Sequence, residues 1–367
     1  MLVRRHNKWL RKFVVYNRQQ SRVKTVTIAI PSLHRPDLTA LCLDFIQQQT
    51  LPPDTWDVVV IENEARPDSI LPDPLPPNTQ RIELSTNEGT TGSINRAVAQ
   101  TESRYVLLLN NDVEMHPDYL AKLTQALDSD PKLGFATGKL LRATQRTHLD
   151  GAGDAMLMSG AAYRLGHFDP DNGQYDRAMP VLSGCGAAVL YRREVLELCG
   201  GLDEEFVAYL EDVDLALRAH LLGYTGIYLP QAVAYHVGSA TLGDVLHPRI
   251  VEYLTRNQIY LLAKDYPSSV LWRLLPRIAV YQGLWMMYAV RRGRLGSSLR
   301  GWWAGLHGLA RMRRKHRALM ANRRITDDEF LAQLRQSERQ IYDWQRSLPP
   351  AEHSGLLKLY FRLFGKP

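Results

Sequence analysis

Two groups of acidic and amide side chains have residue types and spacing that could support chemistry. The first group, Asn110, Asn111 and Asp112, directly follows the apolar run Val106 to Leu109. Four consecutive apolar residues predict a strand buried on both faces, and open α/β sheets bind ligands at the carboxyl ends of such strands. A carboxylate there could hold a divalent cation against a diphosphate. Asn and Asp are also ordinary turn residues, so a simple strand-to-loop turn is the competing interpretation.

The second group is the adjacent acid pair Glu211 and Asp212 in "YLEDVDLALRAH". Apolar residues at helical spacing predict an amphipathic helix whose first turn carries the two acids. The helix dipole alone favours acids there, so they need no chemical role. A carboxylate beside an acceptor hydroxyl could instead remove its proton during a displacement reaction. We expect Asp214 to be structural or to pair with Arg218 one helical turn later.

Strands and helices alternate through the segment before Asp112, and this order predicts a mainly parallel sheet. "TVTIAIPSLHRPD" predicts a strand stopped by Pro31, "DTWDVVVIENEA" a second strand, residues 81–84 a third, and "NEGTTGSINRAVAQT" a turn that leads into a helix. Glycines in that turn would let the backbone approach a ligand, and the helix N-terminus favours an anion. The strand ends would place four polar side chains along one edge of the sheet: Ser32, Glu62, Asn63 and Asp112.

The long segment between the two acidic groups predicts loops and a hairpin, followed by a small-residue strand over residues 181–190. Two common nucleotide-binding signatures are absent. Ile30 leads into Pro-Ser-Leu-His-Arg rather than G-x-G-x-x-G, and no Walker A pattern occurs. A nucleotide site at this sheet edge would therefore be of another kind.

Charge is distributed unevenly along the 367 residues. Residues 1–24 carry eight Lys or Arg, residues 266–326 carry thirteen, and neither segment contains an acid. Removing these 21 cations from the formal net charge of +7 leaves −14 for the rest of the chain. Basic flanks around an acidic body are expected to meet an anionic partner. Three scattered cysteines, Cys42, Cys185 and Cys199, predict neither a disulfide framework nor a zinc site and fit a reducing compartment.

The N-terminal flank, "MLVRRHNKWLRKFVVYNRQQ", lacks the apolar core of a signal peptide. It predicts either a basic amphipathic helix on a membrane surface or a solvated helix packed on the body, and the sequence leaves both open. In the C-terminal flank, "VLWRLLPRIAVYQGLWMMYAV" is long enough to span a bilayer, but Arg273, Pro276 and Arg277 interrupt it.

Interfacial helices therefore fit the C-terminal flank better. Its tryptophans favour the headgroup level of a membrane, and its arginines favour anionic lipid: Trp272, Trp285, Trp302 and Trp303 stand among these cations. Nucleic acid could attract the same arginines, but no recognition motif accompanies them, so it is not expected as a partner. The predicted location is cytoplasmic, peripheral on the inner face of the cytoplasmic membrane.

Taken in order, seven motifs resemble those of the family-2 glycosyltransferases, with their GT-A nucleotide-sugar-binding fold. The likeness is to non-processive rhamnosyltransferase-like and galactofuranosyltransferase-like members. The motifs are "VTIAIPSLHRPD", "VVVIENEA", "NEGTTGSINRA", "LLLNNDVEM", "SGCGAAVLYRREV", "GGLDEEFVAYLEDVDLALRAHLLGY" and "AYHVGSAT". The resemblance implies an α/β GT-A domain over residues 25–265, with a Rossmann-like, mainly parallel sheet covered by helices on both faces. It stands between the segment 1–24 and a basic α-helical region over 266–367.

The resemblance also implies roles for individual residues. Nucleotide-binding positions would be Pro31, Ser32, Glu62, Asn63, Gly92, Asn95, Arg96 and Asn111. A divalent metal, Mn²⁺ or Mg²⁺, would be held by Asp112 and His236, with Asn110 where the family's Asp-x-Asp motif has its first acid. Imidazole suits Mn²⁺ better than Mg²⁺. The donor and acceptor pocket would contain Ser183, Gly184, Cys185, Gly186 and Arg256, although a helix-surface role for Arg256 is equally compatible with the sequence.

The implied reaction is a single displacement in which Asp212, supported by Glu211, activates the acceptor and the anomeric carbon inverts. A sugar would move from a dTDP-rhamnose-like donor or a UDP-sugar to a hydroxyl of a glycan or lipid-linked glycan in cell-surface polysaccharide biosynthesis. A glycosidase also uses two carboxylates but needs neither nucleotide pocket nor metal, so it is the weaker enzyme prediction.

The alternative from another class is a catalytically inactive, membrane-associated nucleotide- or glycan-binding protein of the same fold. Asn110 favours this alternative, whereas the intact pair Glu211 and Asp212 argues against it. The sequence leaves the sugar, the base, the acceptor and the oligomeric state open.

Overall fold

The computed structural model describes residues 23–238 and 247–367. The predicted N-terminal helix within residues 1–24 and the end of the "AYHVGSAT" motif lie largely outside these described residues. The strands are β1 (Lys24–Ser32), β2 (Trp56–Glu62), β3 (Thr79–Glu83), β4 (Ser103–Leu109), β5 (Val113–Met115), β6 (Leu133–Arg142), β7 (Gln145–Gly151), β8 (Asp154–Met156), β9 (Ala162–Arg164), β10 (Met179–Val181), β11 (Ala188–Arg192) and β12 (Thr225–His236).

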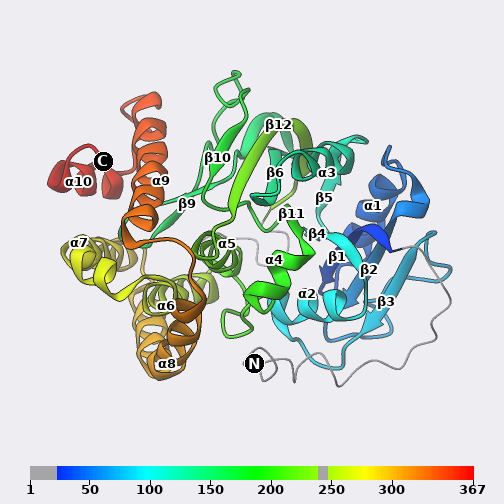
Figure 1. Cartoon of the computed structure of the whole chain (residues 1–367), viewed down its shortest axis with the longest axis horizontal. Coiled ribbons are helices and arrows are strands. Elements are labelled where there is room, and N and C mark those ends of the chain that lie inside the picture. The colour runs from blue at the N-terminus through cyan, green and yellow to red at the C-terminus, as the bar shows by residue number, and fades with distance from the viewer. Residues whose placement is uncertain (1–22, 239–246) are drawn as a thin grey trace.

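The helices divide into one set around the sheet and one set after it. The first set comprises α1 (Pro36–Gln47), α2 (Gly89–Ala99), α3 (Tyr119–Ser129), α4 (Arg193–Cys199) and α5 (Glu211–Leu221), with a 3₁₀ turn, η2 (Pro53–Thr55), before β2. The second set comprises α6 (Pro248–Asp265), α7 (Ser268–Arg291), α8 (Leu295–Asn322), α9 (Asp327–Ser347) and α10 (Gly355–Phe364). Figure 1 shows the second set gathered at one end of the molecule and β1 to β3 at the other.

The central sheet is mainly parallel, as predicted. Its strand order is β10-β12-β6-β11-β4-β1-β2-β3, with β5 paired to β12 and β7 paired to β6. The pairs β3-β2, β2-β1, β1-β4 and β6-β12 are parallel, while β11 runs antiparallel to both of its neighbours. Strands β8 and β9 form a separate antiparallel hairpin.

Alternating side chains of each central strand enter two different cores. Ile28 and Ile30 of β1 share a cluster with residues of α1 and α3, whereas Ala29 packs with residues of α2, α4 and α5. Side chains of a strand point alternately to the two faces of its sheet, so a strand that is apolar throughout must be covered on both faces. The layers are therefore helix, sheet and helix, and the predicted α/β class is confirmed.

The pairing register brings the polar strand ends together. Ser32 pairs with Glu62, and Ala29 pairs with Leu108, so β1, β2 and β4 end side by side. The strand does not stop at Pro31 as predicted but continues through Ser32, whose carbonyl accepts from the Asn63 N–H at 2.8 Å. Pro31 has no N–H, and its backbone nitrogen lies on the side of β1 that faces β4. The pairing of β1 with β4 has already ended at Ala29, so the proline removes no hydrogen bond from the sheet.

The single strand predicted over residues 181–190 is wrong. Strand β10 ends at Val181 and β11 begins only at Ala188. Between them the backbone of Ser183 bridges to Asp154, which starts the β8–β9 hairpin, and the glycines that follow leave no side chain to continue a ladder. The chain therefore changes neighbours at this point instead of running straight.

The C-terminal helices pack on the α/β domain. A third core cluster joins α5 to α6, α7, α8 and α9. Residues of α9 also accept backbone N–H groups of the hairpin region, with Ser337 Oγ bound to Met156 N at 2.6 Å and Glu338 Oε1 bound to Met158 N at 3.2 Å. The predicted α-helical C-terminal region is confirmed, and none of the helices in the described part of the chain has the length and hydropathy needed to cross a membrane.

Candidate active site

Hydrogen bonds connect the ends of β1 and β4 to the first turn of α1. The Ser32 and Thr39 hydroxyls lie 3.0 Å apart, and Asn111 Nδ2 donates to Thr39 Oγ1 at 3.0 Å. Thr39 in turn donates to the Arg35 carbonyl one helical turn earlier. Two of the predicted nucleotide-binding residues are thus brought together by a helix terminus, where unpaired N–H groups favour an anion.

The end of β2 supplies two more of the predicted residues. Glu62 is buried, and its carboxylate accepts from the Leu71 N–H at 3.1 Å; burial raises the pKa of this group above its usual value. Asn63 Oδ1 accepts from the Glu88 N–H at 3.0 Å, and its amide nitrogen donates to Ser93 Oγ. Asn63 therefore anchors the start of α2 beside the strand ends.

The other α2 residues that were predicted to bind the nucleotide make their contacts away from the carboxyl ends of the strands. Asn95 binds both backbone groups of Leu202, at 2.9 Å each, and Arg96 pairs with Glu88 at 2.9 Å. Gly92 lies within the first turn of α2 rather than in the preceding loop, where a Cβ would lie 2.7 Å from that of Glu88. These three positions, together with Pro31 beside Ser32, stay predictions as nucleotide contacts.

Beyond β4, Asp112 lies against His236, the last residue of β12. Asp112 Oδ1 is 3.3 Å from His236 Nε2, and its second oxygen accepts from the Gly238 N–H at 3.1 Å. The other ring nitrogen, Nδ1, is 2.8 Å from Asp150 Oδ2. Strand β12 pairs with β5 directly after Asp112, with His236 opposite Val113, which explains how residues so distant in sequence meet.

The imidazole between these two carboxylates is positively charged at neutral pH. Burial alone would lower its pKa, but Asp112 and Asp150 raise it to about 9. Burial alone would likewise raise the pKa of Asp112, yet the hydrogen bond and charge of His236 hold it below its usual value. Both carboxylates therefore favour the ionised form, and a divalent cation bound at Nε2 would have to replace the proton on that nitrogen.

A chain of charges continues from Asp150 into the β8–β9 hairpin. Arg164 donates to Asp150 Oδ2 at 2.7 Å, and its Nε lies 3.7 Å from Asp154 Oδ1. Burial, together with the negative charges of Asp212 and Asp150, raises the pKa of Asp154 to about 7 against the opposing charge of Arg164. The hairpin thus links the Asp112 region to the acid pair at the start of α5.

Asp112 and His236 have the donor types that a divalent metal takes, and Asp150 orients the imidazole from behind, as a carboxylate outside the coordination sphere does in metal sites. Asn110 lies beside them at the end of β4, where its N–H donates to the Ala187 carbonyl at 2.9 Å. Within residues 23–238 and 247–367, no three His, Cys, Asp or Glu side chains converge closely enough to hold a metal by themselves. Asp112 and His236 would supply two ligands of a divalent metal, and its remaining ligands would have to come from other groups.

The acid pair begins α5, and Gly186 places a donor on it. The Gly186 N–H donates to Asp212 Oδ2 at 2.8 Å, and a Cβ on Gly186 would lie only 3.1 Å from that oxygen. Residues 183–186, predicted to line the donor and acceptor pocket, are thus adjacent to Asp212. Cys185 is buried between the two glycines, and burial raises the pKa of its thiol well above its usual value.

Glu211 and Asp212 have too few hydrogen-bond donors and cations near them for both carboxyl groups to be ionised. Burial and the charge of Asp212 raise the pKa of Glu211 to about 8, and Glu211 Oε2 is buried without a hydrogen-bond partner among the described residues. Burial also raises the pKa of Asp212, although the Gly186 and Val213 N–H groups oppose this shift. Because Asp212 accepts two backbone N–H groups and Glu211 Oε2 accepts none among the described residues, a proton shared by the pair is favoured on Glu211.

The turn before the acid pair has an unusual backbone. Val207, Tyr209 and Leu210 all adopt positive φ, at 65°, 68° and 65°, a region that side chains other than glycine rarely enter. The amide nitrogen of Asn257 in α6 donates to the carbonyls of Phe206, Ala208 and Tyr209, between 2.6 and 3.0 Å. Helix α6 therefore holds this strained turn in place.

Arg256, predicted either in the donor and acceptor pocket or on a helix surface, supports the same turn. Its Nη2 donates to the Phe206 carbonyl at 2.7 Å, and its guanidinium lies 4.8 Å from the Tyr253 ring centroid. The predicted pairing of Asp214 with Arg218 is confirmed, since Arg218 Nε donates to Asp214 Oδ2 at 3.0 Å. Asp214 also contacts the Lys264 ammonium group in α6.

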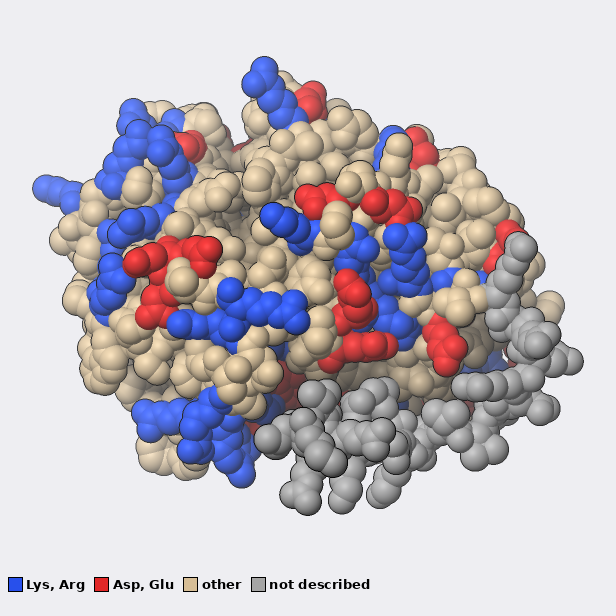
Figure 2. Space-filling model, in the orientation of Figure 1, with Lys and Arg blue, Asp and Glu red and all other residues tan. Residues whose placement is uncertain are grey.

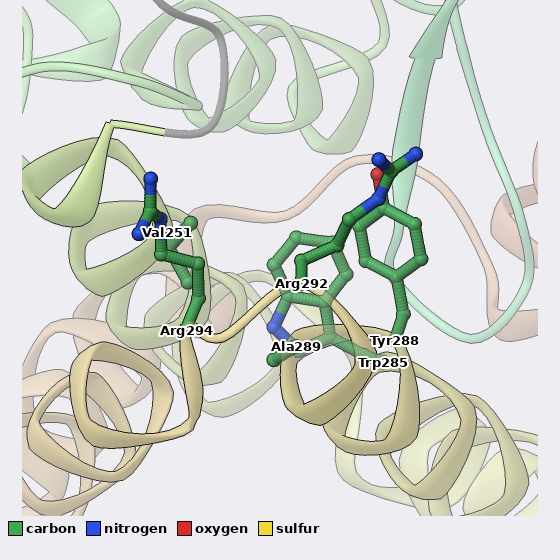
Figure 3. Close-up of a pocket in the computed structure, with 6 residues that line it drawn as sticks. All are labelled: Val251, Trp285, Tyr288, Ala289, Arg292 and Arg294. Atoms are coloured by element: carbon green, nitrogen blue, oxygen red, sulfur yellow. The ribbon is translucent and has the colours of Figure 1, made fainter.

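Two small hollows lie away from the strand ends. One is lined by Val251, Trp285, Tyr288, Ala289, Arg292 and Arg294 in the C-terminal helices, and Figure 3 shows the Arg292 side chain beside the Tyr288 ring. The other lies beside the acid pair, where Asp154, Ser183 and Val213 are among its lining residues. The second hollow is thus the one that belongs to the candidate site.

Three residues of the site were not anticipated from the sequence: Asp150, Asp154 and Arg164. All three stand in the segment predicted only as loops and a hairpin. A cluster of acids and an arginine among glycines in "LDGAGDAMLMSGAAYR" was the available signal, but it does not reveal which groups meet. Arg256 and Asn257 together resemble a family element that follows the core, but the sequence did not predict the hydrogen bonds of Asn257 to the turn before Glu211.

Comparison with known proteins identifies the family. A family model described as glycosyltransferase like family 2 matches residues 24–253. The O-antigen biosynthesis protein RfbC of Myxococcus xanthus is 30% identical over 225 residues, covering 59% of this chain but only 17% of that protein. The N-acetylglucosaminyl-diphospho-decaprenol L-rhamnosyltransferase of Mycobacterium tuberculosis is 25% identical over 243 residues, covering 59% of this chain and 79% of that protein.

Solved glycosyltransferase structures also resemble the chain, at low identity. A mannosyltransferase from Pyrobaculum calidifontis, in complex with GDP-Man and Mn²⁺, is 15% identical, with a TM-score of 0.48 and coverage of 91% of this chain and 92% of that one. The S. aureus TarS structure has a TM-score of 0.46, and the match covers 43% of its chain. The family match spans most of the α/β domain and agrees with the resemblance seen in the motifs: this chain belongs to the glycosyltransferase like family 2.

Proposed function

We propose that the protein is a metal-dependent, inverting glycosyltransferase that moves a sugar from a nucleoside diphosphate sugar to an acceptor hydroxyl. The observation that carries this proposal is the environment of Asp212. Its carboxylate receives the Gly186 N–H at 2.8 Å, while Glu211 beside it has a pKa raised to about 8. One acid of the pair can therefore remain ionised at neutral pH and accept a proton from the sugar acceptor.

The donor would bind across the ends of β1, β2 and β4. Ser32, Asn63 and Asn111 offer neutral polar groups there, next to the N-terminus of α1. Asp112 and His236 would hold the metal, which supplies positive charge to a departing diphosphate. Asp150 fixes the imidazole through Nδ1, so that Nε2 is directed toward Asp112.

Asp212 would act on the acceptor. As the acceptor hydroxyl attacks the anomeric carbon, its proton passes to the Asp212 carboxylate, and the bond between that carbon and the diphosphate oxygen breaks. The Gly186 N–H and the α5 N-terminus stabilise the ionised form of Asp212 before the reaction. A single displacement of this kind inverts the configuration of the sugar carbon.

Two relatives suggest the acceptor class. One is named for O-antigen biosynthesis and another for rhamnosyl transfer to a diphospho-decaprenol-linked sugar. We therefore propose a glycan or lipid-linked glycan acceptor in cell-surface polysaccharide biosynthesis, and a dTDP-rhamnose-like or UDP-sugar donor. The reaction would take place at the inner face of the cytoplasmic membrane, where nucleotide sugars and a lipid-linked acceptor could meet.

The test is transfer by the full chain from a panel of nucleotide sugars to lipid-linked and soluble glycans, with Mn²⁺ or Mg²⁺, followed by NMR of the product. The expected product has the anomeric configuration opposite to that of the donor. Retained configuration would overturn the single displacement, and activity that survives chelation would overturn the metal requirement. Tight donor binding without transfer to any acceptor would favour the inactive binding protein.

A further inference from the structure

Helix α8 presents two contrasting faces. Ser297, Ser298, Gly301, Gly305 and Gly308 are buried. A Cβ on Gly305 would lie 2.6 Å from Ile259 Cδ1, and a Cβ on Gly301 or Gly308 would overlap the Glu252 carbonyl or the Tyr260 ring. Small residues on this face let α8 approach α6 closely, and this is the face of α8 that packs against the rest of the protein.

The opposite face of α8 exposes large apolar side chains in a continuous row. Leu295, Leu299, Trp302, Trp303 and Leu306 are 40%, 52%, 43%, 65% and 37% exposed. They recur at intervals of three and four residues, which places them on one side of a helix. Met287 and Val290, near the end of α7, are also exposed, at 42% and 53%. Contiguous apolar surface of this kind marks a contact site.

The same face becomes basic toward the end of α8. Arg313, Arg314 and Arg317 are exposed, continue the spacing of the apolar row, and have no carboxylate partner among the described residues. Residues 268–322, which span α7 and α8, contain no acid. Figure 2 shows basic side chains gathered over α8 at the lower left of the molecule. We call this surface, with its apolar half (Leu295 to Leu306) and its basic half (Arg313 to Arg317), the α8 face.

We propose that the α8 face docks on the surface of an anionic phospholipid bilayer. Tryptophan prefers the headgroup level, leucine side chains extend into the acyl boundary, and arginines attract anionic headgroups within a Debye length. A second copy of the chain is a poorer occupant, because the α8 face of that copy contains no acid to pair with Arg313, Arg314 and Arg317. The occupant is therefore a lipid surface.

Ion pairs connect the docked helix to the candidate site. Arg311 pairs with Glu205 at 2.9 Å, and Lys315 pairs with Asp203. Both acids stand in the segment that leads into the strained turn before Glu211. Docking through α8 would thus fix the orientation of the acid pair relative to the membrane. The docking inference does not require the proposed transfer reaction, although it names the surface that would bring the protein to a lipid-linked acceptor.

Flotation of the full chain with vesicles tests the proposal. We expect co-flotation with vesicles of phosphatidylglycerol and phosphatidylcholine, and much weaker flotation with phosphatidylcholine alone. Raising the salt from 0.1 M to 1 M shortens the Debye length from about 10 Å to about 3 Å, so it should remove the arginine contribution and leave a smaller apolar remainder.

Two sets of variants separate the halves of the face. Arg313→Gln/Arg314→Gln/Arg317→Gln should weaken binding to anionic vesicles on the order of 100-fold, because each cation near the surface contributes a factor of about five. The control, Arg66→Gln/Arg104→Gln/Lys132→Gln, removes the same charge from the α/β domain, outside α7 and α8, and should leave binding nearly unchanged.

Leu299→Gln/Trp303→Gln should remove the salt-resistant remainder. Leu198→Gln in α4 is its control, since Leu198 is 51% exposed and Leu299 52%. Absence of flotation by the wild type, or equal flotation of the arginine variant and its control, would overturn the proposal. So would a dimer in light scattering that the Leu299/Trp303 variant abolishes, because the face would then bind a second copy. Flotation needs no turnover, and failure of transfer to a soluble acceptor would count only against the proposed reaction.

Discussion

Asp112 and Asp212 are the central carboxylates of two acidic centres that differ in how their charge is balanced. Asp112 lies 3.3 Å from His236, a residue whose pKa is raised to about 9, and is therefore matched by a cation. Asp212 receives only backbone N–H groups and has a second carboxyl, Glu211, directly beside it. The first centre is the proposed metal site. In the second centre, burial favours keeping a proton that a solvated pair of carboxyl groups would lose at neutral pH.

This difference assigns separate tasks to the two centres. A compensated carboxylate is a weak base and a good ligand, whereas an uncompensated pair can hold and pass protons near neutral pH. The β8–β9 hairpin connects them through Asp150, Arg164 and Asp154. The four experiments below test whether the two tasks are separable.

The largest effect is expected from Asp212→Asn. The amide keeps the shape but cannot accept the acceptor proton, so transfer should fall by about 10²–10⁴-fold while donor affinity stays unchanged. Single-turnover transfer and calorimetric binding of the nucleoside diphosphate measure the two quantities. Transfer within tenfold of wild type would show that the second centre is not the base.

Asp150→Asn is expected to have a smaller effect, and to act on binding of the nucleoside diphosphate rather than on the transfer step. The amide weakens the hold on His236 Nδ1, so metal-dependent binding of the nucleoside diphosphate should fall by roughly 10–100-fold. The same variant should leave metal-free binding nearly unchanged. Asp171→Asn is a useful control. Asp171 lies in a neighbouring loop, where it pairs with Lys139 of β6 and not with His236. Equal losses with and without metal would mean that Asp150 supports the fold rather than the metal centre.

The third experiment loosens the turn that positions Glu211 and Asp212 without changing the charge of either residue. Asn257→Ala removes the donor to the carbonyls that precede Glu211, and each such hydrogen bond is worth about 1 kcal/mol, so kcat should fall about tenfold with little change in the donor KM. Asn257→Asp should be at least as impaired, because a carboxylate cannot donate to carbonyls. A KM change with unchanged kcat would contradict positioning of the acid pair.

The smallest effect concerns stability and pH. Glu211 has a folded pKa raised to about 8 from an ordinary 4.5, so the folded state keeps a proton that the unfolded chain loses as pH rises. The contribution of Glu211 to stability is therefore fully present below pH 4.5 and declines as the pH rises toward 8. Glu211→Gln should remove this dependence and raise the Tm at pH 8 by on the order of 2–4 °C. Parallel Tm curves for the two proteins from pH 5 to 8 would refute the shift.

Several features could be predicted because they depend on local pattern. Apolar runs that end in polar residues located Ser32, Glu62, Asn63 and Asp112 at one edge, and the register confirms that the strands end together. The Asp214–Arg218 pair followed from helical spacing alone. The ordered motifs also indicated the family, which the family match confirms. Individual roles of the predicted site residues remain predictions.

Other features depend on contacts between distant segments. Asp150 and His236 are 86 residues apart, and Asn257 is about 50 residues from the carbonyls it binds. The strand predicted over residues 181–190 failed for the same reason, since its interruption comes from pairing with Asp154 in another hairpin. No periodicity within one segment contains this information.

By itself, then, the sequence determined the alternation of elements, the edge where polar groups gather and the basic character of the C-terminal helices, because hydropathy period and charge are properties of neighbouring residues. Only the tertiary structure decided the charge states of the two centres and which face of α8 is exposed. A pKa depends on burial and on charges within a few ångströms, and those neighbours are brought together from separate strands and helices. Asp112 and Asp212 are the same residue type, and the surroundings that the fold builds around each make them different groups.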